Sequence, residues 1–269
     1  MNWEPHGPAL LFCPADRPER YEKALAAADM VILDLEDGVG ANDKEDARRA
    51  LVETPLDPRR TIVRVSAVGT NDFAQDLAAL DETPYAVVML SKTESVDDVR
   101  AVGKYQVIAL CETARGVAAA SSIAAASPTV AMMWGAEDLI ASLGGSSSRD
   151  EDGHYRDVAR YARAQVLVAA GAQGLVAIDA IHLEISDLEG LGRGARDAAA
   201  SGFGATACIH PSQVETIRSA YRPSDSEVLW AEGVLRASNA EHGVFTFEGR
   251  MVDAPLLRHA QEIVRRAGR

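Results

Sequence analysis

The chain has 269 residues, of which 47% are hydrophobic and 25% are charged, and its formal net charge is −13 at pH 7. This length suits one large α/β domain, and the composition supports a sizeable core and argues against disorder. The acidic balance excludes a binding surface for nucleic acid or for an anionic membrane, because both require clustered lysine and arginine. No signal peptide and no run of roughly 18 apolar residues is recognisable, so we expect a soluble, cytoplasmic protein.

Eight short β-branched or aliphatic runs predict buried strands along most of the chain. They cover residues 9–13, 31–34, 62–65, 86–90, 107–111, 130–134, 175–178 and 205–209. Helical segments with recognisable starts separate many of them, at 19–28, 43–52, 72–80, from Ser95, and at 154–172, 188–201 and 212–220. This alternation predicts an α/β fold, a (β/α)₈ TIM barrel over residues 1–220, whose active site lies at the C-terminal strand ends.

Residues 221–269 form an extension that a closed barrel does not need. We expect a helix over 223–240, a short extended piece over 244–247, a turn over 249–253 and a final helix over 254–267. Apolar segments beyond a closed fold often pack on a neighbouring subunit. The extension therefore predicts a homo-oligomer.

A glycine- and serine-rich stretch at 144–153 follows the sixth predicted strand. It is expected to be a flexible loop on the active-site side. Such a loop is either a lid or, through Arg149, an anion site, although it lacks the lysine and the spacing of a P-loop.

Two carboxylates follow adjacent predicted strands. Glu112 comes directly after the fifth run and Asp138 comes shortly after the sixth. Carboxylates without a nearby histidine or cysteine pair suit a hard cation such as Mg²⁺. The alternative is a pair of strand-end acids that bind neighbouring helix N-termini.

Charged residues also end the second and third runs. Arg64 lies inside the apolar run 62–65, where it is costly unless it points to an anion such as a substrate carboxylate. The alternative is a structural salt bridge to Glu36 or Asp37. The string Leu-Asp-Leu-Glu-Asp-Gly at 33–38 holds three acids, which require Arg64, another cation or metal-bound water as partners.

Seven strings of residues, taken in order, resemble the citrate lyase beta-subunit family of the HpcH/HpaI aldolase superfamily, especially its stand-alone members. They are LFCPADRPER, VILDLEDGV, VRVSA, LCETARG, MWGAEDL, CIHPSQ and GRMVDAPLL. The resemblance implies a (β/α)₈ barrel that assembles as a trimer or hexamer. It also implies chemistry that makes or breaks a carbon–carbon bond between a 2-oxo acid and an acyl-CoA thioester.

The resemblance further implies roles for single residues. Glu112 and Asp138 would ligate Mg²⁺, and Glu36 and Asp37 would hold metal-bound water. The oxo-acid carboxylate would be bound by Arg64 together with the backbone around Gly135 and Ala136. Asp253, in GRMVDAPLL, matches an acid/base aspartate that related lyases deliver from a neighbouring subunit.

Several further residues carry two interpretations. Lys92 follows Ser91, where the family more often has proline, and is either a cation near the carboxylates or a solvated loop lysine. His210 is either a substrate contact or a structural hydrogen-bonding group. A last group comprises cations that either meet coenzyme A phosphates or are exposed helix residues: Arg17, Arg20 and Lys23. The three cysteines, which form no CxxC pair, are expected to be buried free thiols: Cys13, Cys111 and Cys208.

The predicted function is a Mg²⁺-dependent lyase that cleaves a 3-hydroxyacyl-CoA of the citramalyl, malyl or hydroxymethylglutaryl type, with citramalyl-CoA favoured. Mg²⁺ would polarise the substrate hydroxyl, and an acid would protonate the departing thioester enolate. Three alternatives remain. They are a citrate lyase beta subunit within a larger complex, a metal-dependent aldolase acting on free oxo acids, and a non-catalytic acid-binding subunit.

Overall fold

The computed structural model describes residues 3–239 and 243–268. The chain divides into two compact units, Met1–Ile217 and Arg218–Arg269. Among the described residues, no helix combines the length and the apolar character needed to cross a membrane.

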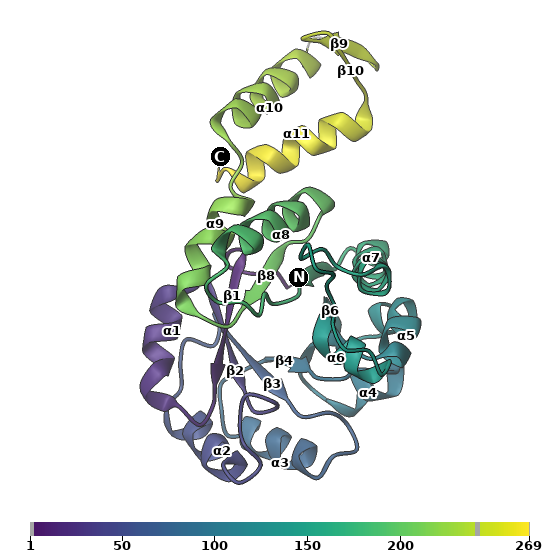
Figure 1. Ribbon diagram of the computed structural model, residues 1–269. Coiled ribbons are helices and arrows are strands. Elements are labelled where there is room, and N and C mark those ends of the chain that lie inside the picture. Colours follow the sequence, from purple (N-terminus) through teal and green to yellow (C-terminus); the bar gives the residue numbers. More distant parts are fainter. Residues whose placement is uncertain (1–2, 240–242, 269) are drawn as a thin grey trace. The chain divides into compact units, whose positions relative to one another are not determined.

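The first unit is a closed barrel of eight parallel strands in sequence order, which confirms the predicted fold class (Figure 1). The strands are β1 (Ala9–Pro14), β2 (Met30–Asp34), β3 (Thr61–Val65), β4 (Val87–Leu90), β5 (Gln106–Cys111), β6 (Thr129–Trp134), β7 (Val176–Asp179) and β8 (Ala205–Cys208). Their side chains are buried almost throughout, as expected for parallel strands covered on both faces. The predicted runs fall within a residue or two of these bounds.

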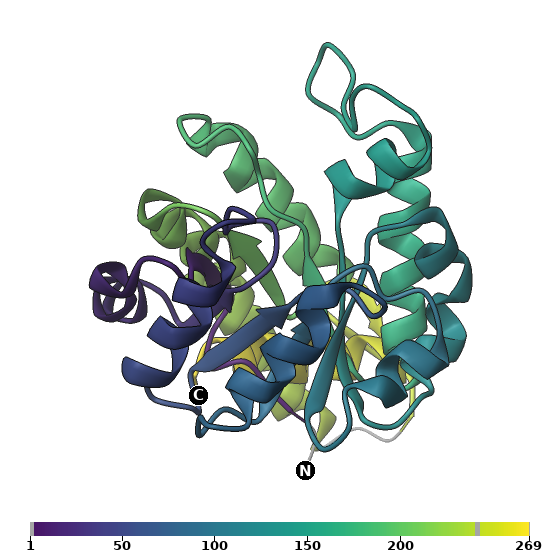
Figure 2. The ribbon, with the colours of Figure 1, turned by 90° about the horizontal axis from the view of Figure 1, so that it is seen from below.

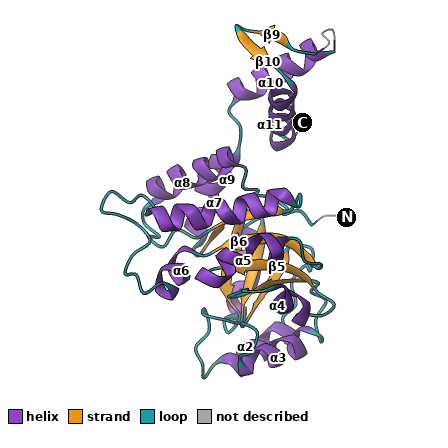
Figure 3. Cartoon of the chain, turned by 90° about the vertical axis from the view of Figure 1, so that its right-hand side faces the viewer, coloured by secondary structure: helices purple, strands orange, loops and turns teal. Residues whose placement is uncertain are grey.

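Helices surround the strands, as Figure 3 shows in purple around orange. They are α1 (Tyr21–Ala27), α2 (Lys44–Glu53), α3 (Asn71–Leu80), α4 (Val96–Ala101), α5 (Ala114–Ala124), α6 (Ala136–Ser142), α7 (Asp157–Ala172), α8 (Leu188–Ser201) and α9 (Val214–Tyr221), with short 3₁₀ turns η1 (Pro18–Arg20) and η2 (Pro211–Gln213). Sequence analysis did not anticipate α5 and α6. Because α6 starts shortly after β6, Gly135 is its N-cap.

The barrel interior is packed by aliphatic and methionine side chains from all eight strands. This cluster contains Leu10, Met30, Ile32, Ile62, Val87, Met89, Ile108, Leu110, Ala131, Met133, Ile178, Ala205 and Ala207. All three cysteines are buried and free, as predicted. The interior is therefore a packed core, and any pocket must lie at a barrel mouth.

The strand register brings distant residues together at the C-terminal mouth. Asp34 on β2 pairs with Arg64 on β3, and Cys111 on β5 pairs with Trp134 on β6. Glu112 and Gly135 each follow one member of the second pair, so they lie beside each other. In Figure 2 the segments that join α6 to α7 (teal) and β7 to α8 (green) extend beyond the strands.

The second unit contains α10 (Asp225–Ser238), a two-stranded hairpin of β9 (Phe245–Phe247) and β10 (Arg250–Val252), and α11 (Ala254–Arg266). The expected turn over 249–253 is wrong, because most of that segment is β10. The two turn residues, Glu248 and Gly249, both have positive φ. Two-residue turns of this kind are common in hairpins, because their twist matches that of the flanking strands. The predicted helix over 223–240 ends at Ser238, and its last position, Ala240, lies outside the described residues.

The second unit has a hydrophobic core of its own. Its buried members are Val228, Ala231, Val234, Val252, Ala260 and Ile263. Gly233 allows close packing there, because a Cβ at this position would lie 2.6 Å from Cζ of Phe247. Asp253 joins β10 to α11 and caps the helix by accepting a hydrogen bond from the N–H of Leu256 at 3.1 Å.

Candidate active site

A cavity of about 370 Å³ lies at the C-terminal ends of the barrel strands. Its lining contains carboxyl groups and one arginine, together with apolar side chains. The polar members are Asp34, Asp37, Arg64, Glu112, Glu137 and Asp138, and the apolar members include Phe12, Leu110, Met133, Ile181, Leu183 and Ile209. Such a mixture suits a small ligand that has both charged and apolar groups.

Arg64 is held in place by the acids that follow β2. Its Nε and Nη2 donate to the two carboxylate oxygens of Asp34 at 2.7 and 2.6 Å, and Nη1 lies 3.1 Å from Oε2 of Glu36. The guanidinium also stacks over the ring of Phe12 at 4.9 Å. Arg64 thus makes the salt bridge to Glu36 that sequence analysis considered. Its bidentate contact with Asp34 is one case of the cation that the three acids at 33–38 were expected to need. It still lines the cavity.

Lys92 comes shortly after β4, and its side chain points toward a cluster of carboxyl groups. Its ammonium group contacts Oε1 of Glu36 and lies 3.1 Å from Oδ2 of Asp37 and 3.7 Å from Oδ1 of Asp138. Burial alone would lower the pKa of Lys92, but the hydrogen bond to Glu36 raises it and keeps the side chain charged. Its geometry is that of a cation among the carboxylates and not that of a solvated loop lysine.

Lys92 also fixes Glu112 through its backbone. With φ at 47°, Lys92 adopts the left-handed conformation, which is unusual for a residue other than glycine. In this conformation its N–H donates to Oε1 of Glu112 at 3.0 Å. One residue therefore contacts four acids, three through its side chain and one through its main chain.

Glu112 is a buried carboxyl group, with 2% of its surface exposed. Burial, and then the nearby charge of Asp138, raise its pKa to about 8. Asp138 in the first turn of α6 is the more open partner, with 39% of its side chain exposed. The pair combines a fixed carboxyl group with an accessible one, and an added cation would favour the ionised form of Glu112.

Negative charge exceeds positive charge around the cavity. Among the described residues, three cations lie in or next to the cavity lining: Arg64 lines the cavity, Lys92 contacts its acids, and Lys44 donates to the carbonyl groups of Leu35 and Glu36, both at 2.6 Å. The same region holds six carboxyl groups, which are those of Asp34, Glu36, Asp37, Glu112, Glu137 and Asp138. Full ionisation would leave an excess of three negative charges. Two oxygen donors in such a field fit a hard divalent cation.

Gly135 gives Glu112 the room that it needs. A Cβ at position 135 would lie 2.7 Å from both Cβ and Oε2 of Glu112. We therefore expect Gly135→Ala to displace the carboxylate and to weaken Mg²⁺ binding about tenfold or more, measured by titration calorimetry. Gly194→Ala is the matched control, since a Cβ there meets no atom within 4 Å. Equal Mg²⁺ affinity in both variants would contradict the assigned contact.

Other predicted site residues belong to other segments of the chain. His210 is exposed and caps η2, accepting a hydrogen bond from the N–H of Ser212 at 3.2 Å, as a structural residue does. Arg17 pairs with Asp16 and Arg20 pairs with Glu19 on the surface, while Lys23 is exposed. Their contact with coenzyme A stays a prediction. Asp253 belongs to the second compact unit.

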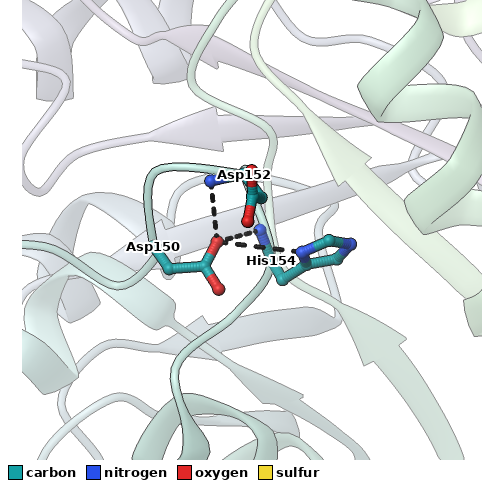
Figure 4. A group of neighbouring side chains, drawn as sticks. All are labelled: Asp150, Asp152 and His154. Carbon is teal, nitrogen blue, oxygen red and sulfur yellow. Dashed lines mark hydrogen bonds and ion pairs between the residues drawn. The ribbon is translucent and has the colours of Figure 1, made fainter.

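Polar groups of the loop over 144–153 bond within the loop and to residues on either side of it. Arg149 stacks on the ring of Tyr155 at 3.7 Å and donates to the carbonyl of Gly153 at 2.7 Å, while Oγ of Ser148 donates to Oε1 of Glu137 at 2.6 Å. Figure 4 shows Asp150, Asp152 and His154, whose ligand atoms lie within 4.8 Å of one another. All three are exposed, and Asp150 accepts N–H bonds from the other two. This group is a polar turn.

Comparison with known proteins identifies the family of the chain. A family model described as HpcH/HpaI aldolase/citrate lyase matches residues 9–211. The citrate lyase subunit beta-like protein of Mycobacterium tuberculosis (strain ATCC 25618 / H37Rv) is 61% identical over 268 residues, which cover 100% of this chain and 98% of that protein. The mitochondrial citramalyl-CoA lyase of Homo sapiens is 33% identical over 291 residues, which cover 95% of this chain and 84% of that protein.

A solved structure extends the agreement to three dimensions. The crystal structure of protein CitE from Mycobacterium tuberculosis, in complex with magnesium, acetoacetate and coenzyme A, matches with a TM-score of 0.95 at 61% identity. The match covers 98% of this chain and 99% of that chain. The family match, the relatives and the shared fold confirm the resemblance drawn from the sequence strings, and the chain belongs to the HpcH/HpaI aldolase/citrate lyase family.

Proposed function

We propose that the chain is a Mg²⁺-dependent carbon–carbon lyase that cleaves a 3-hydroxyacyl-CoA, citramalyl-CoA in the first instance, to a 2-oxo acid and an acyl-CoA. The observation that carries this proposal is the buried carboxyl group of Glu112 beside Asp138, in a cavity with excess negative charge. The magnesium and coenzyme A bound by the related structure, and the activity named for the human relative, support the same reaction.

Glu112 and Asp138 are the residues that would hold the metal. Both offer carboxylate oxygens, the donors that Mg²⁺ prefers, and together they leave room for water and substrate oxygens. When bound, Mg²⁺ would polarise the carboxylate and hydroxyl oxygens of the substrate as a Lewis acid. Glu36 and Asp37, which share the Lys92 ammonium group with Asp138, would orient water around such an ion.

The cleavage itself is balanced in protons. The substrate hydroxyl releases its proton to water and becomes the carbonyl of the 2-oxo acid, while the carbon–carbon bond breaks and its electron pair passes to the thioester enolate. The enolate then takes up one proton from an acid. The acid that protonates the enolate regains a proton from water, so the overall reaction neither consumes nor releases a proton. Asp253 is the candidate acid, contributed by the second unit of a neighbouring subunit in a trimer or hexamer.

Arg64 and the first residues of α6 would position the substrate. Arg64 lines the cavity, with its guanidinium oriented by Asp34 and Glu36, so it presents a fixed positive charge to a carboxylate. The backbone of Gly135 and Ala136 lines the same cavity next to Glu112. Lys92 provides a second cation near the metal ligands.

A panel assay tests the proposal. Purified protein is supplied with Mg²⁺ and, in turn, citramalyl-, malyl- and hydroxymethylglutaryl-CoA, and the released 2-oxo acid is measured. We expect citramalyl-CoA to be cleaved and EDTA to abolish the reaction. Failure of all three thioesters in the presence of Mg²⁺ would refute the proposed activity.

Replacement of Arg64 by lysine tests its role in binding. Lysine keeps the charge but loses the planar fork, so we expect kcat/KM to fall by about 10–100-fold, as for a lost charged hydrogen bond. Arg59→Lys is the matched control, because Arg59 makes the same kind of bidentate contact, with Asp57, at an exposed site. Unchanged binding of pyruvate to Arg64→Lys by calorimetry would make Arg64 a purely structural partner of Asp34.

A further inference from the structure

Gln213 is a buried amide that connects two loops at the mouth of the barrel. It ends η2, which begins shortly after β8, and none of its surface is exposed. Its Nε2 donates to the carbonyl of His182 at 2.9 Å, and its Oε1 accepts from the N–H groups of Ile209 at 3.0 Å and His210 at 3.3 Å. Both ends of the amide are therefore paired, as burial requires.

These bonds hold the apolar part of the cavity lining. Ile181 and Leu183 flank His182 in the segment between β7 and α8, and Ile209 follows β8. All three apolar side chains line the cavity. One side chain thus ties the backbone that carries Ile181 and Leu183 to the backbone that carries Ile209.

We propose that Gln213 is a positioning residue that sets the spacing of this apolar lining and so selects a methyl group over a hydrogen atom on the oxo carbon of the substrate. The inference rests on the proposed function and names the residue that sets the substrate selectivity of that reaction. Contact between apolar atoms weakens steeply when a gap of 0.5–1 Å opens, by about a quarter to a half of the well depth. A methyl group can therefore be recognised only if the lining is held in place.

Gln213→Glu removes one bond selectively. The new side chain has the same shape and still accepts from the N–H groups of Ile209 and His210, but once ionised it cannot donate to the carbonyl of His182. When protonated, it regains a donor. The affinities for pyruvate and glyoxylate, which differ by that methyl group, are measured by calorimetry with Mg²⁺ present at about pH 5 and about pH 9.

We expect wild-type protein to favour pyruvate by about tenfold or more, the usual effect of one methyl group in an apolar pocket. Gln213→Glu should lose most of this preference at the higher pH and regain it at the lower pH. The ratio cancels changes in Mg²⁺ affinity that affect both ligands. Wild-type protein at both pH values controls for the titratable neighbours His182, His210 and Asp187, and Gln173→Glu, at an exposed position, controls for the added charge.

Gln213→Asn provides a second test that introduces no charge. It is one methylene shorter and cannot span both loops, so the preference should fall equally at both pH values. An unchanged preference in either folded variant, or a wild-type protein that does not discriminate between the two acids, would overturn the inference. Discrimination without thioester cleavage would instead refute only the proposed reaction, and binding of neither acid would refute both.

Discussion

Glu112→Gln should abolish Mg²⁺-dependent turnover while leaving the fold intact. The amide preserves the size of the side chain and can still accept from the N–H of Lys92, but it removes the charge of the buried ligand. Removal of a group that hydrogen-bonds to a metal ligand lowers metal affinity or activity by about 10–100-fold. We expect a larger loss of turnover and of Mg²⁺ affinity here, because the ligand itself is changed. Turnover with each thioester and Mg²⁺ titration by calorimetry measure the two effects.

Stability separates a lost ligand from a damaged fold. Burial raises the pKa of Glu112 from 4.5 to about 8, so the folded metal-free protein binds this proton more tightly than the unfolded chain does. The stability of the metal-free protein should therefore fall as the pH rises from 4.5 to 8, and glutamine removes this cost. We expect the metal-free variant to have an equal or higher free energy of unfolding at pH 8.

Glu45→Gln, with 87% of the glutamate side chain exposed, is the matched control for Glu112→Gln and should retain full activity. Wild-type Mg²⁺ affinity and turnover in Glu112→Gln would remove Glu112 from the metal site. A large loss of stability in the metal-free variant would instead assign Glu112 a structural role.

Asp253→Asn should lower turnover by about 10²–10⁴-fold, the usual contribution of a general acid or base, with Mg²⁺ and pyruvate binding retained. Asparagine is as good an N-cap as aspartate, so it can accept from the N–H of Leu256 and preserve α11. The change therefore removes the transferable proton and little else. Asp225→Asn, an exposed change in the same unit, is the control and should remain active.

Mixing the two inactive chains tests whether Asp253 acts between subunits. In a mixed oligomer of Asp253→Asn and Glu112→Gln chains, some sites combine an intact metal centre from one chain with an intact Asp253 from the other. Part of the activity should then return after subunit exchange. No recovery after exchange has been verified would mean that Asp253 serves its own barrel or takes no part in the reaction.

The barrel could be predicted from sequence because each strand is a short, largely apolar run with a turn or helix on either side. Runs such as 31–34 and 107–111 carry this signal without help from tertiary contacts. The extension was predicted less well. Its hairpin depends on the pairing of β9 with β10 and on positive φ at Glu248, which no local propensity reveals.

The site was predictable where charge interrupts an apolar run and less so where partners come from different strands. Arg64 and Glu112 were conspicuous for this reason. Asp34 was one of three acids in the string at 33–38, and only the register of β2 on β3 selects it as the bidentate partner of Arg64. Gln213 carried no signal beyond its place in CIHPSQ, because an amide that joins two loops is evident only once both loops are placed.

The charge imbalance at the barrel mouth has a kinetic consequence. A 2-oxo acid is an anion, and a cavity in which carboxyl groups outnumber cations repels it until a cation has reduced the local potential. The same field attracts divalent cations from solution. Metal and oxo acid should therefore enter in a compulsory order, the metal first, and the organic acid should leave before the metal does.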